Sequence, residues 1–302
     1  MLLALAFLGA PVPGAARETL QVIVFPGGFN WPIWAAQERG FFARDGLEVK
    51  LTPTPSSVFQ LTNLIEGKFD IGMTAIDNVI AYQEGQGEAT VSATSDLFAF
   101  MGGDNGFLRL VVQPEITGYG ELRGKELSVD ALTTGYAFVL RKMLERGGLR
   151  EGDYTLVRAE SVLPLEVLAE SAGLRRLGNA VDVLGHYQGL VGAARRSWAQ
   201  THQRELVGYI RAYRAGLAWL YDRANTSEAL ALLQKNVRGM TPELAAKTYD
   251  VLLGRGFEPE AALDVEGIRT VLALRSQYGR PQKELTDPAR YYDLSYYERA
   301  RR

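Results

Sequence analysis

The sequence predicts an α/β fold with two lobes, and three observations carry this prediction. Residues 22–78 alternate between short apolar runs and amphipathic stretches, the order that builds a sheet covered by helices. From Ala199 onward the hydrophobic spacing becomes helical only. A chain of 302 residues is also long enough to bury two medium-sized cores.

Apolar and β-branched runs predict seven strands, near residues 20–25, 47–51, 69–73, 89–95, 107–112, 126–130 and 154–157. Residues with helical spacing predict helices at 31–42, 58–65, 134–146, 206–220, 228–236, 242–253, 264–278 and 288–301. Strands therefore dominate the first half of the chain, and helices dominate the second.

Three strand-to-helix joints are the candidate ligand sites. The first N–H groups of a helix lack partners within the helix and carry partial positive charge, so they can hold polar or anionic groups. The first joint holds Gly28, Phe29, Asn30 and Trp31, the second holds Thr74 and Ala75, and the third holds Thr133, Thr134, Gly135 and Tyr136.

Each joint also has a plainer explanation as an ordinary turn or capped helix start. Asn30 is a suitable N-cap residue, and so is either Thr133 or Thr134. Asp77 can satisfy the start of the helix that follows the second joint, and would then compete with an anion there. The sequence leaves both explanations open.

The composition excludes several kinds of chemistry. The absence of cysteine rules out disulfides, thiol nucleophiles and thiolate metal sites. His186 and His202 are the only histidines, too few for a histidine-rich metal site. A net charge of −2 with scattered basic residues does not indicate nucleic acid or an anionic membrane surface as a partner. The sequence contains no nucleotide-binding loop, nucleophile elbow or metal-ligand spacing, so we expect no cofactor, no metal and no enzymatic activity.

The first 16 residues have the pattern of a signal peptide. Met1–Leu8 is an apolar stretch too short to span a bilayer, and Gly14–Ala16 supplies small residues for cleavage. No Lys or Arg precedes the apolar stretch, which departs from the usual pattern. A buried first element is the alternative, but Pro11 and Pro13 argue against it. The expectation is an exported, periplasmic protein.

Four segments carry a family resemblance. "WAAQERGFFARDGLEVKL", "LIEGKFDIGMTAIDN", "GKELSVDALTTGYAFVLRKMLERGGL" and "LTDPARYYDLSYY" resemble the substrate-binding proteins of bacterial ABC importers, in the branch for sulfonates, nitrate, taurine and thiamine-pyrimidine precursors. The resemblance implies a type II periplasmic binding protein fold. It also implies a small-molecule ligand, an ABC permease of the inner membrane as partner, and a monomer.

The resemblance further implies how the chain is divided. The first lobe is expected at residues 17–105 plus 190–302, and the second at 106–189. The glycine-rich segments 102–106 and 185–189 are then the two hinge crossovers, or else two ordinary turns. Tyr187 at the return crossover is a further candidate ligand contact. The expected ligand is a small organic anion such as a sulfonate, with a neutral pyrimidine-like ring as the alternative.

One region departs from the family pattern. Between Val157 and Leu163 roughly two dozen residues are missing relative to related binding proteins, about a helix and a strand. We therefore expect a shortened second lobe, with a deletion near residues 158–162. The other reading of the chain is thus a non-transporting remnant or an interaction protein.

Overall fold

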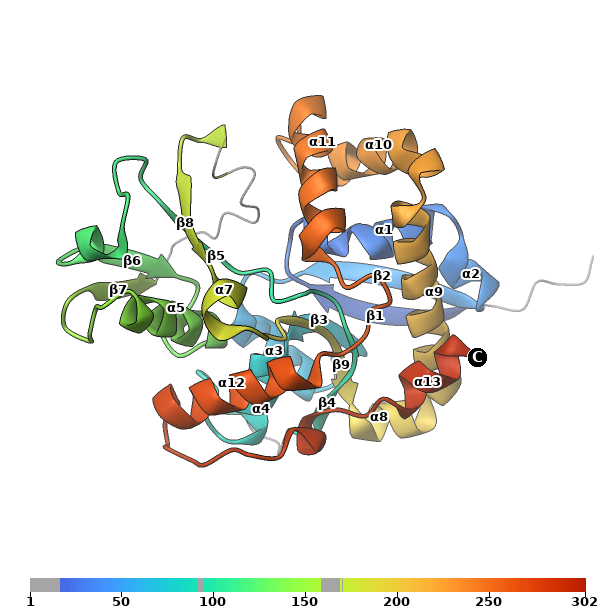
Figure 1. Ribbon diagram of the computed structural model, residues 1–302. Helices are drawn as coiled ribbons and strands as arrows, with labels where there is room; N and C mark the ends of the chain where they lie inside the picture. The colour runs from blue at the N-terminus through green and yellow to red at the C-terminus, as the bar shows by residue number, and fades with distance from the viewer. Residues whose placement is uncertain (1–16, 92–94, 159–168, 170) are drawn as a thin grey trace, which may run out of the picture.

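The computed structural model describes residues 17–91, 95–158, 169 and 171–302. The predicted signal peptide, residues 1–16, lies outside the described residues. Figure 1 shows a larger part built around one sheet and a smaller part built around the strands between Arg109 and Asn179. The prediction of a two-lobed α/β fold is confirmed.

A five-stranded mixed sheet forms the centre of the larger part. Its strand order is β2-β1-β3-β9-β4. β1 runs parallel to β2 and β3, whereas β9 is antiparallel to both β3 and β4. The return of the chain as β9 between β3 and β4 ties the second half of the sequence into the first sheet. The strands are β1 Glu18–Val24, β2 Leu47–Pro53, β3 Ile71–Ala75, β4 Leu97–Gly102 and β9 Leu190–Arg195.

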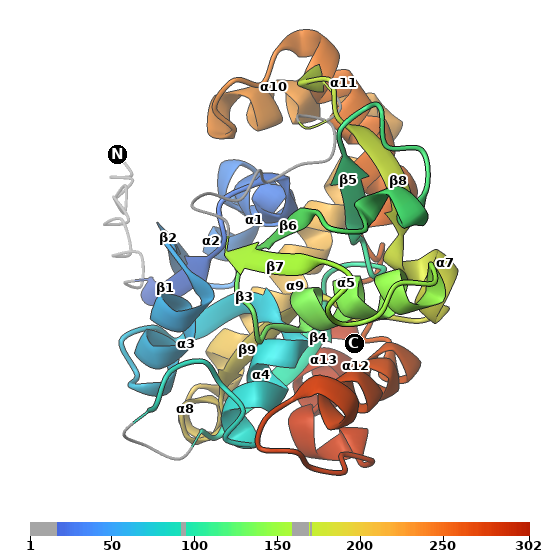
Figure 2. The same cartoon turned by 90° about the vertical axis from the view of Figure 1, so that its left-hand side faces the viewer.

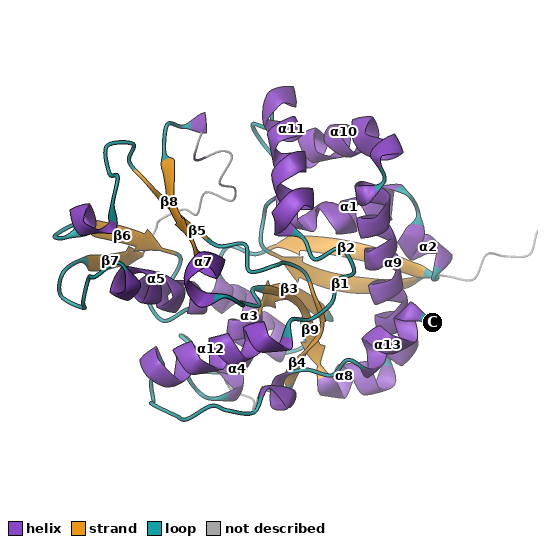
Figure 3. Cartoon of the chain, viewed as in Figure 1, coloured by secondary structure: helices purple, strands orange, loops and turns teal. Residues whose placement is uncertain are grey.

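Helices cover both faces of this sheet (Figure 3). One hydrophobic core contains α1 Trp31–Glu38, α2 Phe41–Arg44, α9 Gln203–Tyr221, α10 Thr226–Asn236, α11 Pro242–Val251 and α13 Ser295–Arg301. A second core contains α3 Ser57–Ile65, α4 Ile76–Gln83 and α12 Val265–Tyr278. The short helix α8, Arg196–Thr201, follows β9.

The smaller part contains two separate two-stranded sheets. β5 Arg109–Val112 pairs antiparallel with β8 Arg175–Asn179, and β6 Glu126–Val129 pairs parallel with β7 Thr155–Arg158. Among the described residues no strand joins the two pairs. The predicted deletion falls between β7 and β8, where residues 159–168 lie outside the described chain. The deletion stays a prediction, and the division into two sheets agrees with it.

Two helices complete the smaller part, α5 Gly135–Arg146 and α7 Ala180–Leu184. One face of α5 packs on a small third core with Val129 and Leu144. Its other face carries Phe138 and Met143 into the second core of the larger part. Figure 2 shows α5 beside α4 and α12, and α12 contacts both helices. The two parts therefore share one continuous hydrophobic core along this side.

The prediction of a strand at 89–95 was wrong for its described residues. Residues 89–91 are not in a strand, and the strand forms instead at β4, Leu97–Gly102, which is buried along its whole length. A strand buried on both faces has no polar alternation, so its pattern is weak in the sequence. β8 and β9 were not predicted, and β9 is composed largely of small residues.

Candidate functional site

The second and third joints meet across the boundary between the two parts. Asp77, in the first turn of α4, is 1% exposed. Its Oδ2 accepts a hydrogen bond from the backbone N–H of Gly135, the first residue of α5, at 2.6 Å. The approach requires glycine, because a Cβ at residue 135 would lie 2.4 Å from Asp77 Cγ. An internal carboxylate thus occupies a place where the sequence suggested a ligand anion.

Arg275 of α12 balances the charge of Asp77. Its Nε donates to Asp77 Oδ1 at 2.6 Å and its Nη2 donates to Oδ2 at 2.7 Å, a bidentate pair. Nη2 also donates to the carbonyl of Thr133 at 3.1 Å, and Nη1 donates to Gln86 Oε1 at 3.2 Å. Both charged side chains are almost fully buried. The third joint is therefore held by a buried ion pair from α4 and α12.

The threonines of the third joint do not cap α5. Thr134 occupies the N-cap position without a capping hydrogen bond, and its hydroxyl donates to Asp130 Oδ1 at 2.9 Å instead. Burial raises the pKa of Asp130, while the Thr134 hydrogen bond opposes the rise. Thr133 is exposed. The sequence allowed Thr133 or Thr134 to cap this helix, and that expectation was wrong. The carboxylate of Asp77, 58 residues away in the sequence, accepts the hydrogen bond from the helix start instead.

The first joint lies against the crossover that leads to β5. The ring of Phe29 packs edge-on against Phe107, with centroids 5.8 Å apart, and against Phe257 at 5.4 Å. The guanidinium of Arg109 lies over the Phe107 ring, 4.0 Å from its centroid. An apolar surface from both parts and a cation thus occur side by side here. Gly28 is buried in the short turn that precedes α1.

Two residues of the first joint have hydrogen-bond partners within the protein. Trp31 is fully buried, and its Nε1 donates to the carbonyl of Ala229 at 3.1 Å, so it packs in the core, and a ligand contact from it stays a prediction. The N-cap role that the sequence allowed for Asn30 was wrong, because its backbone is helical (φ −83°, ψ −2°) and its side chain makes no capping hydrogen bond. Its Nδ2 donates instead to the carbonyl of Phe25 at 2.7 Å.

The second joint is likewise buried. Thr74 is fully buried, and its hydroxyl accepts a hydrogen bond from Asn78 Nδ2 at 3.0 Å. Ala75 is 8% exposed. The Thr74 hydroxyl is thus hydrogen-bonded within the start of α4, and a ligand contact from Thr74 or Ala75 stays a prediction.

Tyr187 lies next to the buried acids. It is 2% exposed, and its hydroxyl has no hydrogen-bond partner among the described residues. Burial raises the pKa of Tyr187, and the charges of Asp77 and Asp104 raise it further, which places the phenol near both. Burial likewise raises the pKa of Tyr136, with Asp104 and Asp130 adding to the effect. An unpartnered buried donor beside two joints is the feature that most resembles a ligand contact.

Asp104 connects the two glycine-rich crossovers. Its Oδ1 accepts from the N–H groups of Gly106 and Gly189, both at 3.1 Å, and its Oδ2 accepts from Leu190 N–H at 2.9 Å. Burial raises the pKa of Asp104 to about 6, although the three backbone hydrogen bonds oppose the rise. A Cβ at Gly189 would lie 2.6 Å from Asp104 Oδ2, so glycine permits this contact. The outgoing and returning chains are thus fixed side by side.

Comparisons with known proteins agree with this geometry. The model of the NMT1/THI5-like family matches residues 30–174. No curated protein matches in sequence. The ligand-binding component of an ABC-type import system from Staphylococcus aureus, with zinc bound, is similar with a TM-score of 0.75 and 11% identity, over 94% of this chain and 99% of that chain. This chain has the periplasmic binding protein fold.

Two further structures share the periplasmic binding protein fold. The periplasmic aliphatic sulphonate-binding protein SsuA from Escherichia coli has a TM-score of 0.69 and 17% identity, over 92% of both chains. DszB in complex with biphenyl-2-sulfinic acid has a TM-score of 0.62 and 12% identity, over 94% of this chain and 99% of that chain. The predicted resemblance to substrate-binding proteins of ABC importers is confirmed at the level of the fold.

Sequence reasoning missed four residues that organise this periplasmic binding protein fold around the joints, namely Asp104, Phe107, Arg109 and Arg275. Arg275 carried one usable signal, because a charge on the apolar side of a helix needs a partner. The others lie in a loop or a short strand, where spacing says nothing about contacts. Among the described residues no group of three or more His, Asp or Glu side chains is placed to hold a metal ion.

Proposed function

We propose that this protein is the solute-binding component of an ABC importer and captures a small molecule between its two lobes. The observation that carries the proposal is the meeting of the second and third joints at the Asp77–Gly135 hydrogen bond. Tyr187 lies beside this contact with an unpartnered buried hydroxyl. Helix starts from both lobes and an unused donor therefore converge on one region.

The proposed lobes are residues 17–105 plus 190–302, and residues 106–189. The crossovers at 102–106 and 185–189 are the proposed hinges, and Asp104 holds them together. A ligand that contacts both lobes favours the closed arrangement, because the open one satisfies only one set of contacts. The closed form is then the state presented to the permease.

The first candidate ligand is a small organic anion such as a sulfonate. The sulphonate-binding neighbour supports this class. The third joint cannot serve as its sole anchor, because Asp77 already occupies Gly135 N–H. Arg109 and the paired rings of Phe29 and Phe107 offer a cation and an apolar surface that suit a sulfonate with an alkyl chain.

A neutral pyrimidine-like ring is the second candidate. Asp77, Asp104 and Asp130 lie around the joints, and of these three only Asp77 forms an ion pair within the described part of the chain, with Arg275. Such surroundings favour a polar ring over an anion. Tyr187 can donate to a ring nitrogen or carbonyl, since its hydroxyl has no other partner among the described residues.

The remaining expectations belong to this proposal as well. The protein is exported to the periplasm, acts as a monomer, binds no nucleic acid and turns over no substrate. In the described part of the chain no helix is long and apolar enough to cross a membrane. A shortened second lobe makes a non-transporting remnant the competing proposal, and ligand capture separates the two.

The test is thermal unfolding with a panel of alkanesulfonates, nitrate, carboxylates and pyrimidines. A ligand at a hundredfold excess over its Kd stabilises the folded protein by about 2.7 kcal/mol, which raises the Tm by roughly 5 °C for a chain of this size. We expect Arg109→Gln to reduce the shift from an anion, and Tyr187→Phe to reduce the shift from a pyrimidine. Arg269→Gln, an exposed change on α12, is the control and should leave both shifts intact. If no member of the panel raises the Tm, ligand capture is refuted and the non-transporting remnant is favoured.

A further inference from the structure

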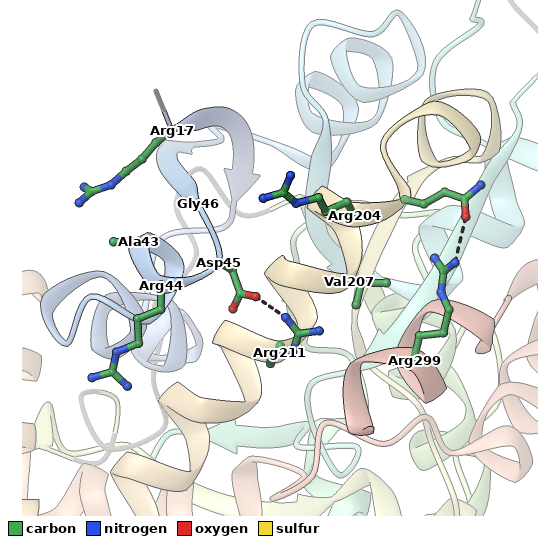
Figure 4. Close-up of a pocket in the computed structure, with 10 residues that line it drawn as sticks. Arg17, Ala43, Arg44, Asp45, Gly46, Arg204, Val207, Arg211 and Arg299 are labelled. Atoms are coloured by element: carbon green, nitrogen blue, oxygen red, sulfur yellow. Dashed lines mark hydrogen bonds and ion pairs between the residues drawn. The ribbon is translucent and has the colours of Figure 1, made fainter. Parts of the chain in front are cut away.

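A surface pocket far from the joints is lined by five arginines. Its volume is about 890 Å³, and its lining comes from the residue before β1, from α2 and the turn into β2, from the start of α9 and from α13 (Figure 4). The five are Arg17, Arg44, Arg204, Arg211 and Arg299. Elements distant in sequence thus bring five arginines to the lining of one hollow, and in Figure 4 the guanidinium groups of Arg17 and Arg44 point away from the other three.

The positive charge of this arginine pocket is largely unbalanced. Asp45 is the only carboxylate among the described residues that line the pocket, and it is bound to Arg211. Arg299 donates to the amide oxygen of Gln203, a neutral partner. Arg17, Arg44 and Arg204 form no ion pair with any carboxylate in the described chain. The lining therefore carries a net charge of +4, from five arginines and one aspartate.

The start of α9 adds to the positive electrostatic potential of the pocket. α9 runs for 19 residues from Gln203, and both Gln203 and Arg204 line the pocket at its first turn. No side chain caps this helix start. The exposed N–H groups and the partial positive charge of a long helix favour an anion at such a place.

The arginine pocket is separate from the proposed ligand site. Arg17 precedes β1, whereas the first joint follows the other end of the same strand. A strand of seven residues spans roughly 23 Å at the usual rise per residue. The two sites therefore lie at opposite ends of β1.

We propose that the arginine pocket binds a phosphate-bearing anion. Arginine presents paired donors that match phosphate oxygens, and phosphate takes up several such forks at once. The shape of the pocket also fits, because an open hollow leaves part of a strongly hydrated group in water. The phosphate can come from a free polyphosphate or from a lipid headgroup, and the experiment distinguishes the two sources.

The experiment measures binding of pyrophosphate by calorimetry at constant ionic strength, and of phosphatidylglycerol vesicles by co-sedimentation. Arg17→Gln/Arg204→Gln removes two cations that make no ion pair in the described chain, so the fold should persist. Arg269→Gln removes one exposed cation elsewhere and is the control. We expect the double variant to bind the responsive probe at least tenfold more weakly and the control to match the parent. Pyrophosphate binding alone assigns the site to free phosphates, and vesicle binding alone assigns it to headgroups.

Failure of both probes to bind the parent protein would overturn the proposal, as would equal affinity in the parent and the double variant. The same double variant also protects the ligand screen against error, because a sulfonate bound in the arginine pocket would mimic capture between the lobes. A sulfonate shift that survives Arg17→Gln/Arg204→Gln but falls with Arg109→Gln belongs to the interlobe site.

Discussion

Neutralising Asp77 should destabilise the protein by several kcal/mol. Asp77 and Arg275 are 1% exposed, and they form a bidentate ion pair with distances of 2.6 and 2.7 Å. In Asp77→Asn the amide oxygen still accepts from Gly135 N–H, so the helix start keeps its partner. Arg275 then remains charged and buried without its counter-ion, which typically costs about 3–5 kcal/mol. At about 2 °C per kcal/mol, the Tm should fall by roughly 6–10 °C.

A double-mutant cycle isolates the ion pair from the packing around it. Arg275→Met keeps an apolar stem over Phe138 and leaves Asp77 unpaired, so it should also destabilise strongly. Asp77→Asn/Arg275→Met removes both charges together. We expect it to be more stable than the sum of the single changes predicts, by about 2 kcal/mol or more.

Urea unfolding of the four proteins at pH 7 measures this cycle. Glu266→Gln is the matched control, because its pair with Arg269 is exposed and should contribute less than about 1 kcal/mol. The reasoning is refuted if Asp77→Asn lies within 1 kcal/mol of the parent, or if the two single changes add without coupling.

Two further predictions concern the contacts between the lobes. Gly135→Ala places a Cβ 2.4 Å from Asp77 Cγ, so we expect loss of the Gly135 hydrogen bond and destabilisation of about 1–3 kcal/mol by urea unfolding; an unchanged midpoint would contradict the contact. Asp104 has a pKa raised to about 6 from its usual 3.8, so its contribution to stability should fall as pH rises from 4 to 6. Relative to Asp104→Asn, the parent should lose roughly 2 kcal/mol over that interval. A parent-to-variant difference that is the same at pH 4 and pH 7 would show that Asp104 does not titrate there.

The local sequence pattern was enough to predict the helices and strands that have one buried face or a regular hydrophobic spacing. The helix at 134–146 and the strands near 126–130 and 154–157 were predicted within one or two residues, as α5, β6 and β7. β4 and β9 were missed because strands buried on both faces do not alternate between polar and apolar residues. In addition, β9 contains Gly192, whose small size is required by a neighbouring strand. A Cβ at Gly192 would lie 2.6 Å from the ring of Phe100 on β4.

The sequence by itself determined the α/β class and excluded cysteine and histidine-rich metal chemistry, since each depends only on which residues are present and how they are spaced. It also picked out the third joint as a helix start. Tertiary structure alone decided what fills that start, because Asp77 is 58 residues away from Gly135 and Arg275 is 198 residues from Asp77. Spacing along the chain reports contacts within one helix or strand. It carries no information on a hydrogen bond that forms only when two separate elements pack together.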